Sequence, residues 1–234
     1  MLMIRNLVKK YKNKEVLNIE YAGFDKGLYG LLGPNGAGKS TMMKLIADII
    51  KPTSGEIEYN GLDSATSEYR AHIGFLPQKF GLYNYYSVRE ILEYFAVLRG
   101  VNKSDISSRI EIVLKQVNLE DRINCKIGKL SGGMKQRLGI AITMIADPDI
   151  LIFDEPTVGL DPEERIRFRN LLNTIKKDKI ILLSSHILSD MEDVADNLWI
   201  LKDGKIVEQT DLSDEHYSYK EIEEIYMNHE ETHV

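Results

Sequence analysis

The chain has 234 residues, a net charge of −6 and a single cysteine, Cys125. This length suits one large domain or a core with a sizeable insertion, and it needs no disulfide or structural metal to fold. One cysteine excludes an intrachain disulfide framework, and the negative charge gives no overall attraction to nucleic acid or anionic lipid. No apolar run approaches the roughly 18 residues of a membrane span, and we expect no signal peptide.

The first 27 residues alternate short apolar runs with turn residues, which predicts two or three antiparallel strands. An apolar run at 28–32 and a helical run at 42–47 then flank a glycine-rich loop, Gly33-Pro34-Asn35-Gly36-Ala37-Gly38-Lys39-Ser40-Thr41. Between a strand and a helix, such a loop aims backbone N–H groups and the helix N-terminus at phosphate oxygens. Lys39 adds a positive charge at the β/γ-phosphates, and Ser40 offers a hydroxyl to Mg²⁺. The loop therefore predicts binding of a nucleoside triphosphate.

The middle of the chain changes from strand to helix periodicity. Residues 56–59 and 73–76 read as strands, the first followed by an Asn60-Gly61 turn. Ser87 and Glu90 form a predicted capping box for a helix with Ile91, Leu92, Phe95 and Leu98 on one side, and Ser107 or Ser108 is expected to open the next helix. We interpret about 85–145 as a helical subdomain inserted into an α/β core, with Gln78 at the hinge.

The core resumes with two continuous apolar runs, 150–153 and 179–184, which are typical of parallel strands buried on both faces. A helix beginning at Pro162 separates them. A hairpin around Asp203-Gly204 closes the core. We expect one domain over 1–210, followed at 211–234 by a short, acidic, weakly helical tail.

Two carboxylates follow the first of these buried strands. Asp154 can hold Mg²⁺ through water, opposite Ser40, and Glu155 can polarise an attacking water as a general base. The alternative is an ordinary strand end whose polar residues reach solvent. The glycine-rich loop earlier in the chain favours the catalytic interpretation.

A second candidate anion site lies at Ser131-Gly132-Gly133, where Ser131 caps a predicted helix. A capped helix without a ligand is the simpler interpretation. If the site is real, it needs a different nucleotide or a different chain, because the glycine-rich loop already holds its own phosphates.

The order of these motifs resembles that of ATP-binding cassette (ABC) ATPases. The motifs that carry the resemblance are the glycine-rich loop, Gln78, Leu130-Ser131-Gly132-Gly133-Met134-Lys135-Gln136-Arg137, Asp154-Glu155, Asp161 and His186. The resemblance covers about residues 1–210. It implies an α/β P-loop fold, with a mixed, mainly parallel sheet in the core, an N-terminal antiparallel β-subdomain and an inserted helical subdomain. It also implies a head-to-tail homodimer that sandwiches two ATP molecules, each between residues 33–41 of one chain and Ser131-Gly132-Gly133 of the other.

The same resemblance assigns roles around the nucleotide. It implies that Tyr11 stacks on adenine, that Lys39 and Ser40 contact the β/γ-phosphates and Mg²⁺, and that Thr41 contacts the α-phosphate. It implies that Gln78 touches Mg²⁺ and the attacking water.

Three further residues lie in motifs near the end of the core. The resemblance makes Glu155 the catalytic base, His186 the switch histidine at the γ-phosphate, and Asp161 the loop aspartate that crosses the dimer interface. Val158 departs from the family, which usually has serine there, and so removes a hydroxyl near the partner's phosphate loop.

The helical subdomain resembles the branch of bacterial drug, antibiotic-peptide and lipid exporters. That resemblance implies a separate transmembrane permease subunit and a cytoplasmic location on the inner face of the membrane. The aromatic residues Phe80, Tyr83, Tyr85 and Tyr86 are either a seat for that subunit or ordinary packing. The alternatives are a soluble cassette ATPase acting on ribosomes or DNA, although no basic stripe predicts nucleic acid, and a nucleotide-binding module without turnover.

Overall fold

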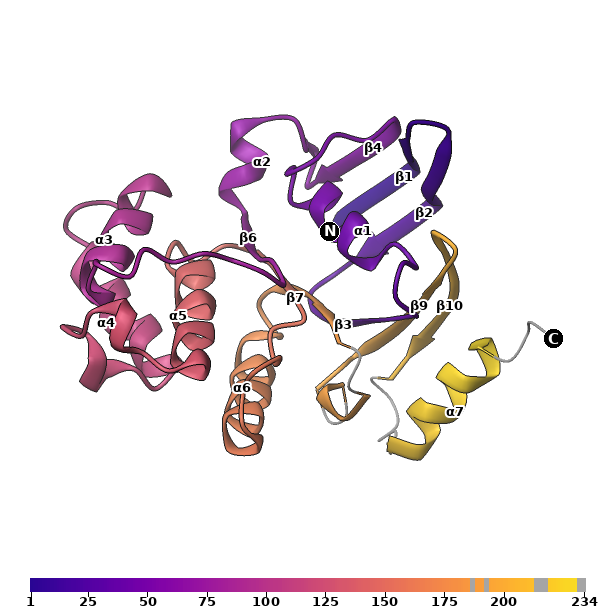
Figure 1. The fold of residues 1–234 in the computed structure, drawn as a ribbon. Coiled ribbons are helices and arrows are strands. Elements are labelled where there is room, and N and C mark those ends of the chain that lie inside the picture. Colours follow the sequence, from indigo (N-terminus) through magenta and orange to yellow (C-terminus); the bar gives the residue numbers. More distant parts are fainter. Residues whose placement is uncertain (186–187, 192–193, 213–218, 231–234) are drawn as a thin grey trace.

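The structure is a computed structural model that describes residues 1–185, 188–191, 194–212 and 219–230. Its N-terminal part is an antiparallel sheet of order β2-β1-β4-β5, seen at the top of Figure 1. These strands are β1 Leu2–Tyr11, β2 Lys14–Phe24, β4 Ser54–Tyr59 and β5 Leu62–Asp63. The β4–β5 hairpin turns at Asn60-Gly61, as predicted.

A second sheet forms the centre of the molecule, with strand order β10-β9-β3-β8-β7-β6. Its strands are β3 Gly27–Leu32, β6 Ile73–Leu76, β7 Ile150–Asp154, β8 Ile180–Ser184, β9 Asn197–Lys202 and β10 Lys205–Asp211. All pair in parallel except β10, which closes the sheet as an antiparallel hairpin with β9. This confirms the mixed, mainly parallel core predicted from the two continuous apolar runs.

Helices cover both faces of this central sheet (Figure 1). They are α1 Lys39–Ile46, α2 Ser67–Ala71, α3 Val88–Leu98, α4 Ile106–Gln116, α5 Gly132–Met144, α6 Pro162–Ile175 and α7 Tyr219–Glu230, with short 3₁₀ turns η1 Glu120–Arg122, η2 Ile127–Lys129 and η3 Leu188–Asp190. Helices α3, α4 and α5 gather at one end of the molecule, away from the antiparallel sheet. None of the described helices is long and apolar enough to cross a membrane.

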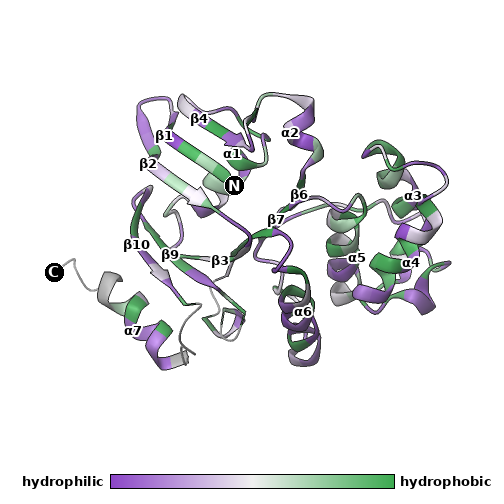
Figure 2. Cartoon of the chain, turned by 180° about the vertical axis from the view of Figure 1, so that it is seen from behind, coloured by the Kyte–Doolittle hydropathy of each residue, from purple (hydrophilic) through white to green (hydrophobic). Residues whose placement is uncertain are grey.

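Alternate residues of β7 enter two different hydrophobic cores. Ile150 and Ile152 pack with α1 and the antiparallel sheet, whereas Leu151 and Phe153 pack with α6 and the helical group. All five residues of the strand are buried, as a parallel strand covered on both faces requires. Figure 2 shows hydrophobic residues along β7 and hydrophilic residues on the outer side of α6.

The capping box at the start of α3 is present, with Ser87 and Glu90 satisfying each other's backbone groups. Two smaller expectations were wrong. Helix α4 begins at Ile106 after Asp105, and the Ser108 hydroxyl donates to the Asp105 carbonyl (2.8 Å) within the first turn. Leu98 is 63% exposed, since it lies in the last turn of α3, beyond the buried stripe.

The C-terminal tail is helical at α7 and adds to the core. Ile222 is buried and belongs to the same hydrophobic cluster as Met191 and Val194, and α7 packs against η3. The tail therefore covers the segment that follows β8.

Candidate functional site

The glycine-rich loop joins β3 to α1, and its backbone geometry depends on glycine. Gly33 has φ +142°, and a Cβ atom there would lie 2.1 Å from the carbonyl oxygen of Leu201. Gly38 has φ +109° and precedes α1, whose N-terminus has no side-chain cap. The first N–H groups of α1 are thus directed at the loop without a competing side chain, which makes an anion site.

The rest of the loop runs from an exposed tip to a buried residue. Pro34, Asn35 and Gly36 are exposed at its tip, whereas Ala37 is buried. The Ala37 carbonyl accepts a hydrogen bond from the N–H of Gly204 (2.9 Å), in the turn between β9 and β10. The hairpin that closes the central sheet therefore supports the loop from behind.

Lys39 is the buried cation of this site. Its side chain is folded into the loop, where Nζ donates to the carbonyl oxygens of Gly33 (2.5 Å) and Pro34 (3.2 Å). Burial lowers the pKa of Lys39, and the negative charges of Glu155 and Asp154 act in the opposite direction. Lys39 therefore lies within electrostatic reach of both carboxylates that the sequence singled out.

Asp154 ends β7 as a buried carboxylate. Its Oδ1 accepts a hydrogen bond from the hydroxyl of Ser184 (2.7 Å), the residue opposite it on β8. Ser40 and Thr41 are half-buried in the first turn of α1. A carboxylate and a hydroxyl beside a phosphate loop are the oxygen ligands that Mg²⁺ uses together with phosphate and water.

Glu155 follows Asp154 in a left-handed backbone conformation, with φ +52°. Its N–H donates to both the carbonyl oxygen (3.2 Å) and the hydroxyl (3.1 Å) of Ser184. Its carboxylate accepts a hydrogen bond from Nε2 of Gln78 (2.7 Å), which lies just after β6. The structure thus brings Gln78 and Glu155 together, as the predicted roles at one attacking water require.

Ser131 caps α5, and its hydroxyl accepts from the N–H of Met134 (3.2 Å). Ser131 and Gly132 are exposed, and a Cβ atom at Gly132 would meet nothing within 4 Å. Among the described residues, no hydrogen bond joins Ser131, Gly132 or Gly133 to the loop at 33–41. The exposed N-terminus of α5 is therefore not joined by hydrogen bonds to the phosphate loop within the described part of the same chain.

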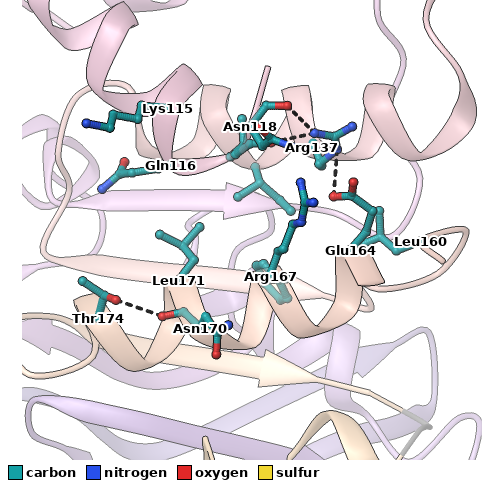
Figure 3. Close-up of a pocket in the computed structure, with 13 residues that line it drawn as sticks. Lys115, Gln116, Asn118, Arg137, Leu160, Glu164, Arg167, Asn170, Leu171 and Thr174 are labelled. Atoms are coloured by element: carbon teal, nitrogen blue, oxygen red, sulfur yellow. Dashed lines mark hydrogen bonds and ion pairs between the residues drawn. The ribbon is translucent and has the colours of Figure 1, made fainter. Parts of the chain in front are cut away.

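Asp161 caps α6, with its carboxylate accepting from the N–H of Glu164 (2.9 Å). Glu164 in turn pairs with Nε of Arg137 on α5 (3.1 Å), and Arg137 also donates to the carbonyls of Val117 and Asn118 after α4. Figure 3 shows the contacts of Arg137 with Asn118 and Glu164 beside a cavity of about 380 Å³ that residues of α4, α5 and α6 line. One arginine thus links the helix that Ser131 caps to the helix that Asp161 caps.

Two of the remaining predicted residues are exposed. Tyr11 ends β1 with 51% of its surface exposed, and the ammonium of Lys9 lies 5.0 Å from its ring centre. Val158 is 47% exposed. His186 lies outside the described residues.

The aromatic cluster is divided between packing and surface. Phe80 and Tyr86 pack against the hydrophobic core, whereas Tyr83 and Tyr85 are more than half exposed. Phe80 and Tyr86 therefore serve ordinary packing, and a seat for a membrane subunit stays a prediction for the two exposed tyrosines.

Sequence reasoning missed four residues at the ends of β7 and β8. Ser184 binds Asp154, and Thr157 and Ser185 both bind Asp190. The only signal in the sequence is a run of hydroxyl residues after a buried strand. This run of hydroxyl residues shows which carboxylates the hydroxyls bind only when the pairing register of β7 and β8 is known.

The glycine-rich loop, the buried lysine and the carboxylates at the end of β7 define a P-loop nucleotide-binding protein. Residues 18–158 match the family model described as ABC transporter. The chain is 37% identical to a lantibiotic transport ATP-binding protein, SrtF, of Streptococcus pyogenes, over 97% of this chain and 96% of SrtF. It is 35% identical to the Nod factor export ATP-binding protein I of Burkholderia orbicola, over 86% of this chain and 67% of that protein.

The fold agrees with solved structures. An ATP-binding cassette solved as a dimer in a post-hydrolysis state, bound to ADP and Pi, superposes with a TM-score of 0.82 at 27% identity. The superposition covers 91% of this chain and 99% of that one. The chain belongs to the ABC transporter family, and it is an ATP-binding and ATP-hydrolysing subunit of that family.

Proposed function

We propose that this chain powers an ABC exporter by closing on ATP as a head-to-tail homodimer beneath a separate transmembrane permease subunit. The relatives named above are transport proteins, one of them described as an export protein, which supports the exporter class. Nothing in them favours the alternative of a soluble ATPase acting on ribosomes or DNA. The chain would then work on the cytoplasmic face of the membrane.

The observation that carries the dimer is the exposed N-terminus of α5. Ser131 and Gly132 present a capped, open helix end with no bond to the chain's own phosphate loop. Such an end favours anions. A second copy, turned head to tail, would bring this end to the phosphates held by residues 33–41 of its partner, and the dimeric cassette of similar fold supports that arrangement.

Within each site, we assign the phosphates to the loop and Lys39, with Thr41 at the α-phosphate and Tyr11 at the adenine. Asp154 and Ser40 would hold Mg²⁺, with Gln78 near it, and the ion would supply charge neutralisation of the phosphates. The described residues contain no cluster of three or more acidic, histidine or cysteine side chains for a metal. A site with few protein ligands fits Mg²⁺, which takes its other ligands from phosphate and water.

For hydrolysis, we assign proton abstraction from the attacking water to Glu155. Gln78 donates a hydrogen bond to that carboxylate, which supports assigning its amide to the same water. We assign His186 to the γ-phosphate and Asp161 to the dimer interface on the family resemblance alone.

The test uses Glu155→Gln, which preserves the size of the side chain but removes the base. With ATP, this variant should elute at twice the mass of the 26.7 kDa monomer, because ATP is bound and not hydrolysed. Light scattering after gel filtration measures the mass. Adding Lys39→Ala to the same chain should return it to a monomer, since the phosphates lose their buried cation. A monomer from Glu155→Gln at saturating ATP would refute the closed dimer.

A further inference from the structure

Asp190 is a buried carboxylate that the proposed chemistry does not use. It is 2% exposed, and its Oδ2 accepts two hydrogen bonds, from the hydroxyls of Thr157 (2.5 Å) and Ser185 (2.7 Å). Both hydroxyl residues are themselves almost fully buried. Burying a carboxylate is costly unless it is well hydrogen-bonded, so this three-residue cluster is a specific arrangement.

The cluster joins two chain segments that border the nucleotide site. Thr157 lies two residues after Glu155, beyond β7, and Ser185 is the first residue after β8. Asp190 belongs to η3. Helix α6 also contacts η3, because its Arg169 donates a hydrogen bond to the Ser189 carbonyl (3.0 Å). The ends of β7 and β8 are thus connected through Asp190.

A second connection joins the last residues of β7 and β8 themselves. There Ser184 binds the carboxylate of Asp154 and the backbone N–H of Glu155. Hydrogen bonds therefore hold the chain at two points: at the N–H of Glu155, and at the hydroxyl of Thr157 two residues later. Its left-handed φ of +52° is unfavourable for a residue with a side chain and persists only where surrounding contacts hold it.

We propose that Asp190 is a positioning residue for ATP hydrolysis. By holding Thr157 against Ser185, it fixes the backbone after Glu155, and so keeps the Glu155 carboxylate where it meets the attacking water. The inference rests on the proposed role of Glu155. Neither Asp190 nor Thr157 hydrogen-bonds to the loop at 33–41 among the described residues, so their effect should fall on turnover and leave ATP binding unchanged.

The principal test compares two substitutions at Thr157 that leave Asp190 intact. Thr157→Val keeps the shape but removes the hydroxyl, and we expect kcat to fall about tenfold because small displacements of a catalytic group reduce rate steeply. The KM for ATP should stay within about twofold of the original value. Thr157→Ser retains the hydroxyl and should restore kcat to within about twofold of the unmodified chain.

Two further variants and a control complete the design. Asp190→Ala removes the acceptor for both hydroxyls and should lower kcat at least as much as Thr157→Val, whereas Asp190→Asn retains an acceptor oxygen and should lose less. Thr143→Val is the matched control. Thr143 is also buried, its hydroxyl donates to the Gly139 carbonyl within α5 (2.9 Å), and its removal should leave kcat unchanged.

The outcomes separate this inference from the function on which it rests. If Glu155→Gln is inactive but Thr157→Val has an unchanged kcat, the positioning role is wrong and the proposed function stands. A loss in Thr157→Ser equal to that in Thr157→Val, or a loss that appears only in KM, also overturns it. If Glu155→Gln itself hydrolyses ATP normally, the proposed base is wrong.

Discussion

Gly33 is the residue whose backbone most constrains the nucleotide loop. A side chain there would meet the Leu201 carbonyl at 2.1 Å, so the loop can adopt its shape only with glycine. Lys39 then occupies the hollow, with its ammonium on the carbonyls of Gly33 and Pro34. A phosphate chain that enters the loop offers the same cation a stronger partner than neutral carbonyls.

Gly33→Ala should therefore abolish high-affinity ATP binding, because the loop must move away from β9 to admit the methyl group. We expect at least a tenfold rise in the ATP dissociation constant, equivalent to about 1.4 kcal/mol. Titration calorimetry measures it. Gly61→Ala is the matched control, since Gly61 also has positive φ (+82°) but open space around it. Equal affinity in the two variants would contradict the role of the close contact.

The sequence predicts some residues of the candidate nucleotide site and misses others. The loop, Asp154 and Glu155 could be predicted because their chemistry lies in contiguous motifs. Ser184, Thr157 and Asp190 could not, because their contacts depend on the register in which β7 pairs with β8. That register is a property of the folded sheet, and no local pattern encodes it.

At the scale of elements, local rules predicted the structure wherever one strong signal was present. The buried strands and α3 follow from apolar runs and a capping box. The start of α4 was misplaced because the sequence offers four candidate caps among the five residues from 104 to 108, and packing of Ile110 and Val113 selects the register. The contribution of α7 to the core was also missed, since its apolar residues are interspersed with acidic ones and its partner, η3, is distant in sequence.

The capping box of α3 predicts a pH-dependent stability. The backbone N–H and hydroxyl of Ser87, together with Lys126, hold the pKa of Glu90 at about 2, below its ordinary 4.5. Because the folded-state pKa is the lower one, the stabilisation is complete above pH 4.5 and is lost as pH falls toward 2. Glu90→Gln should lower stability at pH 7, and the difference should shrink below pH 4.5, as measured by urea unfolding. Glu93→Gln, on the same helix, should show little change at any pH.

At the scale of the whole molecule, the phosphate loop and the N-terminus of α5, which we propose as a second anion site, share no hydrogen bond among the described residues. The loop at 33–41 is supported by the hairpin of β9 and β10, and the exposed end of α5 is linked through Arg137 to α6. Each of the two is therefore supported by contacts within its own chain. A head-to-tail pair would join each loop to the other chain's helix end, and we propose that this pairing is the condition for hydrolysis.

Mixing two inactive variants tests this claim most directly. Lys39→Ala disables the loop, and Gly132→Glu places a carboxylate at the exposed end of α5, where a Cβ meets nothing within 4 Å and the free chain can fold. Each variant alone should lack ATPase activity. In an equimolar mixture, half of the pairs contain both variants and one complete site, so about a quarter of the original activity should return. A mixture as inactive as its components would contradict a site built from two chains.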